Sequence, residues 1–159
     1  NNKNVVTREI IEEFLYHSKD ESAFTLYSAL IYKDIESALD ILNKLIYVKP
    51  EILLSGLVVA HKKFHKIFNL YENENKSLED IFSSLFINSK KIKDEYTFGL
   101  KNYSFKSIVN IFSLLSELDY YLKVFPKELK LIKLQEFVFK FISESKNHML
   151  SGELITFIE

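Results

Sequence analysis

Residues 34–46 read Asp34-Ile-Glu-Ser-Ala-Leu-Asp-Ile-Leu-Asn-Lys-Leu-Ile46, and this stretch has the clearest amphipathic pattern in the chain. Counted from Ile35, apolar residues recur at i, i+3, i+4, i+7, i+10 and i+11, which is the period of one helix face. Asp34 directly precedes the pattern, where its carboxylate can accept hydrogen bonds from the first N–H groups of a helix. The stretch therefore predicts a capped amphipathic helix.

The same period of three to four residues continues on both sides of this stretch. Ser22 and Ser77 stand where helix caps are expected, Pro50 suits a first helical turn, and Pro126 interrupts a long apolar pattern and can begin the last main helix. Pairs such as Tyr-Val have strand propensity, but the helical period persists over long windows and outweighs them. We therefore expect an all-α protein, a compact helical bundle of about five to seven helices.

Composition narrows the classes of function. The 159 residues are 47% hydrophobic, with 3 Gly and 2 Pro, which favours one core built from long elements. The formal net charge of −1 provides no overall attraction to nucleic acid or to an anionic membrane. Cys is absent, and no apolar run approaches the roughly 18 residues of a membrane span. We expect a cytoplasmic protein without disulfides or membrane contact.

The sequence contains no catalytic constellation. Gly56, Gly99 and Gly152 are too scattered to form a phosphate-binding loop. His61 and His65 share a helix face, but Lys occupies the two positions that follow His61, and a cation would be repelled there. We expect residues 61–66 to be a basic, solvated helix face, and we expect no catalytic residues, no cofactor and no metal site.

Residues 77–101 outline two short helices joined by a turn near 86–89, which is similar to a helix-turn-helix. The second helix begins Ser89-Lys-Lys-Ile-Lys93, and such a basic start could meet DNA phosphates. Asp94 and Glu95 follow directly, and the turn has no Gly. A helical pair packed into the bundle is the favoured interpretation, and DNA binding at 77–101 is the alternative.

Aromatic residues gather at the end of the long pattern that precedes Pro126. Tyr120, Tyr121 and Phe125 lie beside Lys123, which can pair with Asp119 one helical turn earlier. Large aromatics on an otherwise complete helix are typical of a surface that meets another protein, although they could equally pack inside this chain. Tyr120, Tyr121, Lys123 and Phe125 are our candidate interface residues.

Three segments together resemble the delta subunit of the bacterial DNA polymerase III clamp loader. Residues 22–42 are similar to the family's Phe-x-Leu-x-x-Ala-Leu helix, its polar turn and the Ala-Leu-x-x-Leu helix that follows. Residues 50–64 resemble the long central helix of the family's collar domain, and residues 104–123 resemble its Leu-x-x-x-Asp-x-x-x-Lys ending. The chain departs from the family at Phe86, where a Gly often sits.

The resemblance implies a fragment of a longer protein. Residues 1–19 would be the terminal helix of a preceding lid domain, residues 20–142 the helical collar domain used for oligomerisation, and residues 143–159 a tail that could form a short helix. The family's collar packs with gamma/tau and delta-prime subunits, and the sliding clamp is bound through an N-terminal domain that this chain lacks. Any DNA contact would be weak or indirect.

The function implied by the resemblance is assembly of the clamp loader during replication, within a complex that is a DNA polymerase but without catalysis by this fragment. Two other interpretations remain: an unrelated helical protein-interaction adaptor, and the DNA-binding domain at 77–101.

Overall fold

The polar residues that precede each apolar pattern begin the helices of this protein. The structure is a computed structural model, and it describes residues 22–45 and 49–144. The predicted lid helix within 1–19 and nearly all of the 143–159 tail lie outside the described residues. Within these ranges every element is a helix, so the predicted all-α bundle is confirmed, with seven helices: α2 (Ala23–Ile31), α3 (Ile35–Lys44), α4 (Pro50–Asn73), α5 (Leu78–Ser84), α6 (Lys90–Asn102), α7 (Phe105–Val124) and α8 (Lys127–Ser143).

Side-chain caps fix where several helices start. Ser22 and Thr25 form a capping box: Thr25 N donates to Ser22 Oγ over 3.4 Å, and Ser22 N donates to Thr25 Oγ1 over 2.8 Å. Asp34 accepts from Ser37 N over 3.0 Å and caps α3. Pro50 is in the first turn of α4, and Pro126 directly precedes α8. These boundaries agree with the positions predicted from the sequence.

Two helices end in the same left-handed turn. After α5, Phe86 has a φ of 55°, Phe86 N donates to Ser83 O over 3.1 Å, and Ile87 N donates to Phe82 O over 2.8 Å. This pair of bonds is the Schellman motif, whose left-handed position is usually Gly because a Cβ is strained there. Lys33, with a φ of 61°, occupies the equivalent position after α2. Phe86 therefore stands at a position where the backbone itself favours Gly.

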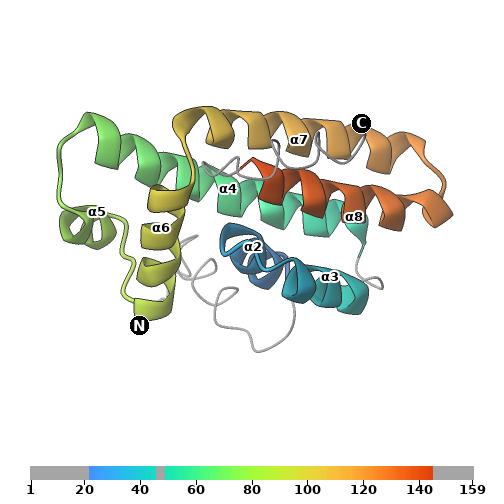
Figure 1. Ribbon diagram of the computed structural model, residues 1–159, viewed down its shortest axis with the longest axis horizontal. Helices are drawn as coiled ribbons and strands as arrows, with labels where there is room; N and C mark the ends of the chain where they lie inside the picture. The colour runs from blue at the N-terminus through green and yellow to red at the C-terminus, as the bar shows by residue number, and fades with distance from the viewer. Residues whose placement is uncertain (1–21, 46–48, 145–159) are drawn as a thin grey trace, which may run out of the picture.

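The long helices lie along the molecule, and the short ones fill one end and one side. Figure 1 shows α4 and α7 running side by side; α2 packs directly against α4, and α8 packs against α7 and α3. The α5–α6 pair lies at one end, and the turn between α7 and α8 lies at the opposite end. Helix α2 contacts α3, α4, α6 and α8, so it is surrounded on most sides despite its length of 9 residues.

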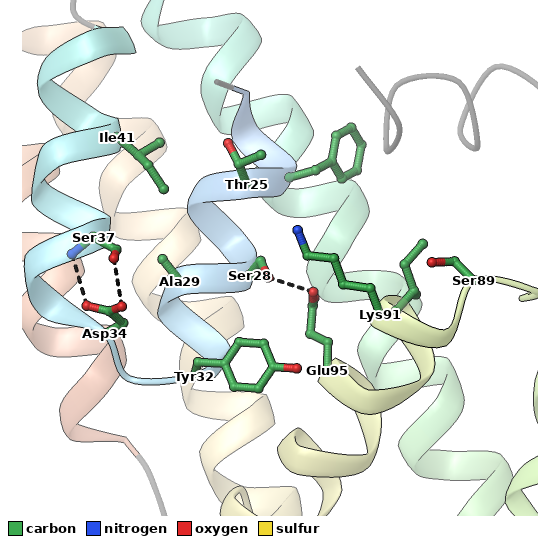
Figure 2. Close-up of a pocket in the computed structure, with 12 residues that line it drawn as sticks. Thr25, Ser28, Ala29, Tyr32, Asp34, Ser37, Ile41, Ser89, Lys91 and Glu95 are labelled. Atoms are coloured by element: carbon green, nitrogen blue, oxygen red, sulfur yellow. Dashed lines mark hydrogen bonds between the residues drawn. The ribbon is translucent and has the colours of Figure 1, made fainter. Parts of the chain in front are cut away.

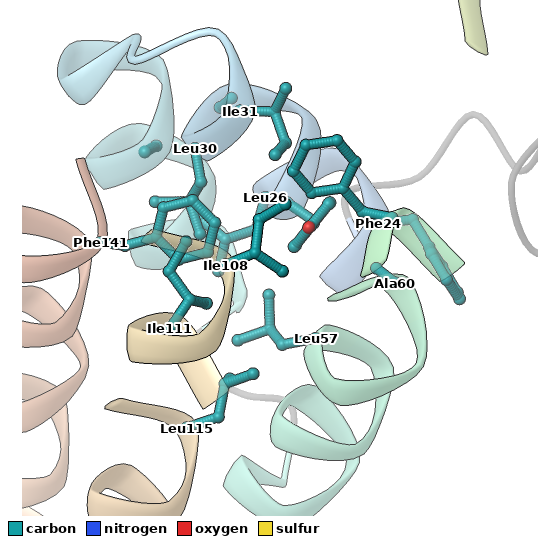
Figure 3. Close-up of a cluster of buried hydrophobic side chains, with 14 of the residues drawn as sticks. Phe24, Leu26, Leu30, Ile31, Leu57, Ala60, Ile108, Ile111, Leu115 and Phe141 are labelled. Carbon is teal, nitrogen blue, oxygen red and sulfur yellow. The ribbon is translucent and has the colours of Figure 1, made fainter. Parts of the chain in front are cut away.

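One core joins α2, α4, α7 and α8 (Figure 3). The start of α4 is not covered on all sides, since Ile52 is 62% exposed. It shares a helix face with Ser55, Lys62 and Lys66, and three of these four are polar, so this face is turned to solvent. The labelled core residues in Figure 3 are Phe24, Leu26, Leu30, Ile31, Leu57, Ala60, Ile108, Ile111, Leu115 and Phe141.

Candidate functional site

The candidate interface residues lie where α7 turns into α8. Helix α7 ends at Val124, Phe125 takes an extended conformation with a ψ of 146°, and Pro126 precedes α8. The chain reverses there because Pro has no N–H to continue the helix and disfavours a helical conformation in the residue before it. This reversal places the last turn of α7 beside the first turns of α8.

Tyr121 and Phe125 pack within the hairpin. Their ring centroids are 5.1 Å apart, and Lys133 Nζ from α8 lies 4.4 Å from the Tyr121 centroid and 5.6 Å from that of Phe125. Tyr121 Oη donates to Glu117 Oε1 over 3.0 Å, and this hydrogen bond raises the pKa of Tyr121. Glu117 also receives Lys140 Nζ at 3.3 Å. These two aromatic rings therefore fasten α7 to α8.

Tyr120 and Lys123 face solvent instead. Tyr120 is 62% exposed, and its only ring contact in the described part of the chain is with Tyr121, at 5.8 Å between centroids. Lys123 Nζ lies 2.5 Å from Asp119 Oδ2 in an exposed pair, which contributes little to stability. Of the four candidate interface residues, Tyr121 and Phe125 therefore pack inside the hairpin, whereas Tyr120 and Lys123 face solvent.

Further apolar side chains are exposed around the same turn. Val124 is 55% exposed and follows Tyr120 by one helical turn, while Leu129 and Ile132 are exposed on α8. We call Tyr120, Val124, Leu129 and Ile132 the hairpin tip. These four large exposed side chains fall within 13 residues on both sides of one turn, and exposed apolar patches are typical of contact surfaces.

The pair α5–α6 is packed into the bundle by its second helix. Ile92, Glu95, Tyr96, Gly99 and Leu100 of α6 are buried, and α6 contacts α2 and α4. At the basic start of α6, Lys93 Nζ is 3.0 Å from Glu79 Oε2 of α5, while Lys90 and Lys91 are exposed. Two lysines at the start of one helix are a small surface for DNA phosphates.

Residues 61–66 were predicted to be a basic, solvated helix face, and this prediction is wrong at His61, which is buried. Its side chain is fully enclosed between α2 and α7, where Nδ1 lies 2.9 Å from Tyr27 Oη and Nε2 lies 2.8 Å from the Ile108 carbonyl. A carbonyl only accepts, so Nε2 carries the proton and Tyr27 donates to Nδ1. Burial lowers the pKa of His61 to about 4, and the ring is therefore neutral.

His65 has different surroundings from His61. It is half-buried, its Nε2 is 3.3 Å from Asn69 Nδ2, and its ring lies 5.4 Å from that of Phe112. Both nitrogens of His61 are already bonded, so the pair does not present two free ligands on one face. Over residues 22–45 and 49–144, no group of three or more His, Asp or Glu side chains could hold a metal ion.

Glu95 is the one buried carboxylate of the described helices, although its position beside Asp94 indicated only a second acidic residue after the basic start of the helix. It is 1% exposed and lies on α6 against α2, where Ser28 Oγ donates to Oε2 over 2.7 Å. Burial raises the pKa of Glu95 to about 7, although the Ser28 hydrogen bond and nearby Lys91 and Lys63 oppose this shift. The group is therefore poised between its neutral and charged forms near neutral pH.

The sequence contains an indication that Glu95 is buried. Ile92, Tyr96, Gly99 and Leu100 form the apolar face of α6, and Glu95 falls inside that face rather than beside it. A carboxylate within an apolar stripe is buried more often for a specific partner than by chance. The position alone could not name the partner, because Ser28 is 67 residues away in the chain.

None of the helices in the described ranges combines the length and the apolar content that a bilayer crossing requires. Comparisons with protein-family models, with curated proteins and with solved structures found no match for this chain.

Proposed function

We propose that this chain is a non-catalytic assembly domain of the type found at the C-terminus of the DNA polymerase III delta subunit. Its partners would be the gamma/tau and delta-prime subunits, and its role would be to hold the clamp loader together while the sliding clamp is loaded. The clamp-loader part of this proposal rests on the resemblance of residues 22–42, 50–64 and 104–123 to that family.

The observation that carries the assembly role is the hairpin tip. The bundle below it has a complete core, so Tyr120, Val124, Leu129 and Ile132 are not needed to close the fold. Burying one Tyr or Leu side chain contributes about 1.5–3 kcal/mol. Four such side chains could supply much of the energy of a specific interface, in which a few apolar and aromatic residues dominate.

The experiment mixes this chain with gamma/tau and delta-prime from the same genome and measures complex mass by size exclusion with light scattering. A stoichiometric complex is expected without added nucleotide. The double variant Tyr120→Ala with Val124→Ala should weaken that complex at least about tenfold, since it removes two side chains that the partner would bury. Its thermal stability should change by less than about 0.5 kcal/mol, because both side chains are exposed.

Tyr71→Ala is the matched control, because Tyr71 is also a largely exposed Tyr but lies on α4, away from the turn. Equal weakening by the control would show that the effect is not specific to the tip. A chain that stays monomeric while the partners assemble normally with full-length delta subunit would refute the clamp-loader assignment and leave the adaptor interpretation.

A further inference from the structure

A pocket of about 380 Å³ opens between α2, α3 and α6 (Figure 2). Its size is within the range of small-molecule sites. Apolar side chains from all three helices line one part of it, and hydroxyl and charged side chains line the rest. Glu95 forms part of its wall, so the pocket joins a buried charge to an apolar surface.

The Glu95 carboxyl has an unused hydrogen-bonding atom. Oε2 accepts from Ser28, but Oε1 is buried and has no hydrogen-bond partner in the described part of the chain. Leaving a buried acceptor unpaired costs about 1–3 kcal/mol, and more when the group is charged. Such a group in a native structure needs an explanation, for example strain, a catalytic role, a water molecule or a bound ion.

Glu95 shares the pocket wall with Tyr32 and Lys91. Figure 2 shows the Glu95 carboxyl between the Tyr32 ring and the extended side chain of Lys91. Tyr32 is 39% exposed, and Lys91 is exposed and forms no ion pair within the described ranges. The exposed Lys91 side chain can change rotamer in picoseconds to nanoseconds without moving a helix. The carboxyl is therefore covered but reachable.

We propose that this pocket binds an organic cation whose guanidinium or ammonium head donates a hydrogen bond to Glu95 Oε1. The apolar stem of the cation would lie against Ile41 and Ile92, and Asp34 at the rim adds a second negative charge. Lys91 is the group that the incoming cation displaces from beside Glu95. This site is separate from the hairpin tip and does not depend on the assembly role.

Such binding is linked to pH through Glu95. With a pKa of about 7, Glu95 is mostly protonated at pH 6 and mostly ionised at pH 8. The other ionisable groups that interact with it are Tyr32 from the end of α2, Lys63 from α4 and Lys91 from α6. Since the cation requires the ionised form, binding should release nearly one proton at pH 6 and almost none at pH 8, and should be about tenfold tighter at pH 8.

The test is isothermal titration with agmatine at both pH values, in two buffers of different ionisation heat. Glu95→Gln keeps the shape and the Ser28 acceptor but should lose at least about tenfold in affinity and all proton release. Asp94→Asn is the matched control, because it removes the same charge at the neighbouring exposed position. It should bind agmatine like the unaltered chain.

A second variant keeps the proposal testable without changing Glu95. Lys91→Met removes the competing ammonium group and should tighten agmatine binding severalfold. Capped arginine, with both ends blocked, separates two sources of the cation: equal binding indicates the basic side chain of another protein, and a preference for agmatine indicates a free small molecule. No agmatine binding, or binding that is unchanged in Glu95→Gln, would overturn the proposal.

Discussion

Replacing Glu95 by Gln should stabilise the protein in a way that depends on pH. The pKa of this carboxyl is about 7 in the folded protein and 4.5 ordinarily. Between these values the folded state keeps a proton that the unfolded state releases, so the free energy of unfolding falls as the pH rises. The loss amounts to about 3 kcal/mol above pH 8, because each pKa unit corresponds to 1.36 kcal/mol.

Gln cannot ionise, so the variant escapes this loss. Its advantage over the unaltered chain should grow by about 2–3 kcal/mol between pH 5 and pH 8. Any fixed cost of the Gln amide, which leaves an N–H without an acceptor, is the same at every pH and cancels in that difference. Urea unfolding followed by circular dichroism at four pH values measures it directly.

His61 makes the comparison with the unaltered chain necessary. Its pKa of about 4 lies below the ordinary 6.5, so the unfolded state binds a proton first and stability falls as the pH drops through this interval. That slope opposes the slope from Glu95, and the two partly cancel in either protein alone. Subtracting the stability of the unaltered chain from that of Glu95→Gln at each pH removes the His61 contribution, since His61 is present in both proteins.

Asp94→Asn again serves as the control, with an expected change below about 0.5 kcal/mol because Asp94 is exposed. If Glu95→Gln differs from the unaltered chain by the same amount at pH 5 and pH 8, then Glu95 does not titrate between them. That result would refute the conclusion that burial raises the pKa of Glu95.

Three further substitutions test the packing. Tyr27→Phe should cost about 1–3 kcal/mol in thermal unfolding, because it leaves Nδ1 of His61 buried without a donor; an unchanged melt would mean that water replaces the hydroxyl. Gly99→Ala should cost about 1–3 kcal/mol in urea unfolding, since the new Cβ would lie 2.8 Å from Cζ of the enclosed Phe64 ring, and a gain in stability would contradict this. Phe86→Gly should stabilise the protein by up to about 1 kcal/mol and so raise its melting temperature, because the relief of left-handed strain exceeds the entropic cost of ordering a Gly. A lower melting temperature would show that the exposed Phe86 ring contributes contacts.

The local signals in the sequence predicted the fold well. Ser22 and Asp34 cap the helices that they were expected to cap, and Pro126 separates α7 from α8, because caps and breakers act over three or four residues. Burial of His61 was not predicted, because its neighbours Lys62 and Lys63 are typical of a solvated face. Its partners Tyr27 and Ile108 are 34 and 47 residues away, and a periodic pattern carries no information about such contacts.

The sequence showed where the candidate aromatic residues gather, but not which of them pack inside the hairpin and which face solvent. The aromatic cluster before Pro126 was visible in the sequence, yet Tyr120 and Tyr121 are adjacent and point about 100° apart on a helix. Which of them faces α8 depends on where Lys133 lies, and only the folded hairpin shows that.

The hydrogen bonds of His61 join an early, a middle and a late helix through one side chain. Breaking either bond while the rest of the structure persists would leave a polar atom sealed from water, so α2, α4 and α7 should open together rather than one by one. Amide exchange in these three helices would then proceed only through their joint opening. These bonds allow the bundle to carry strain applied at the α7–α8 turn without α2 detaching.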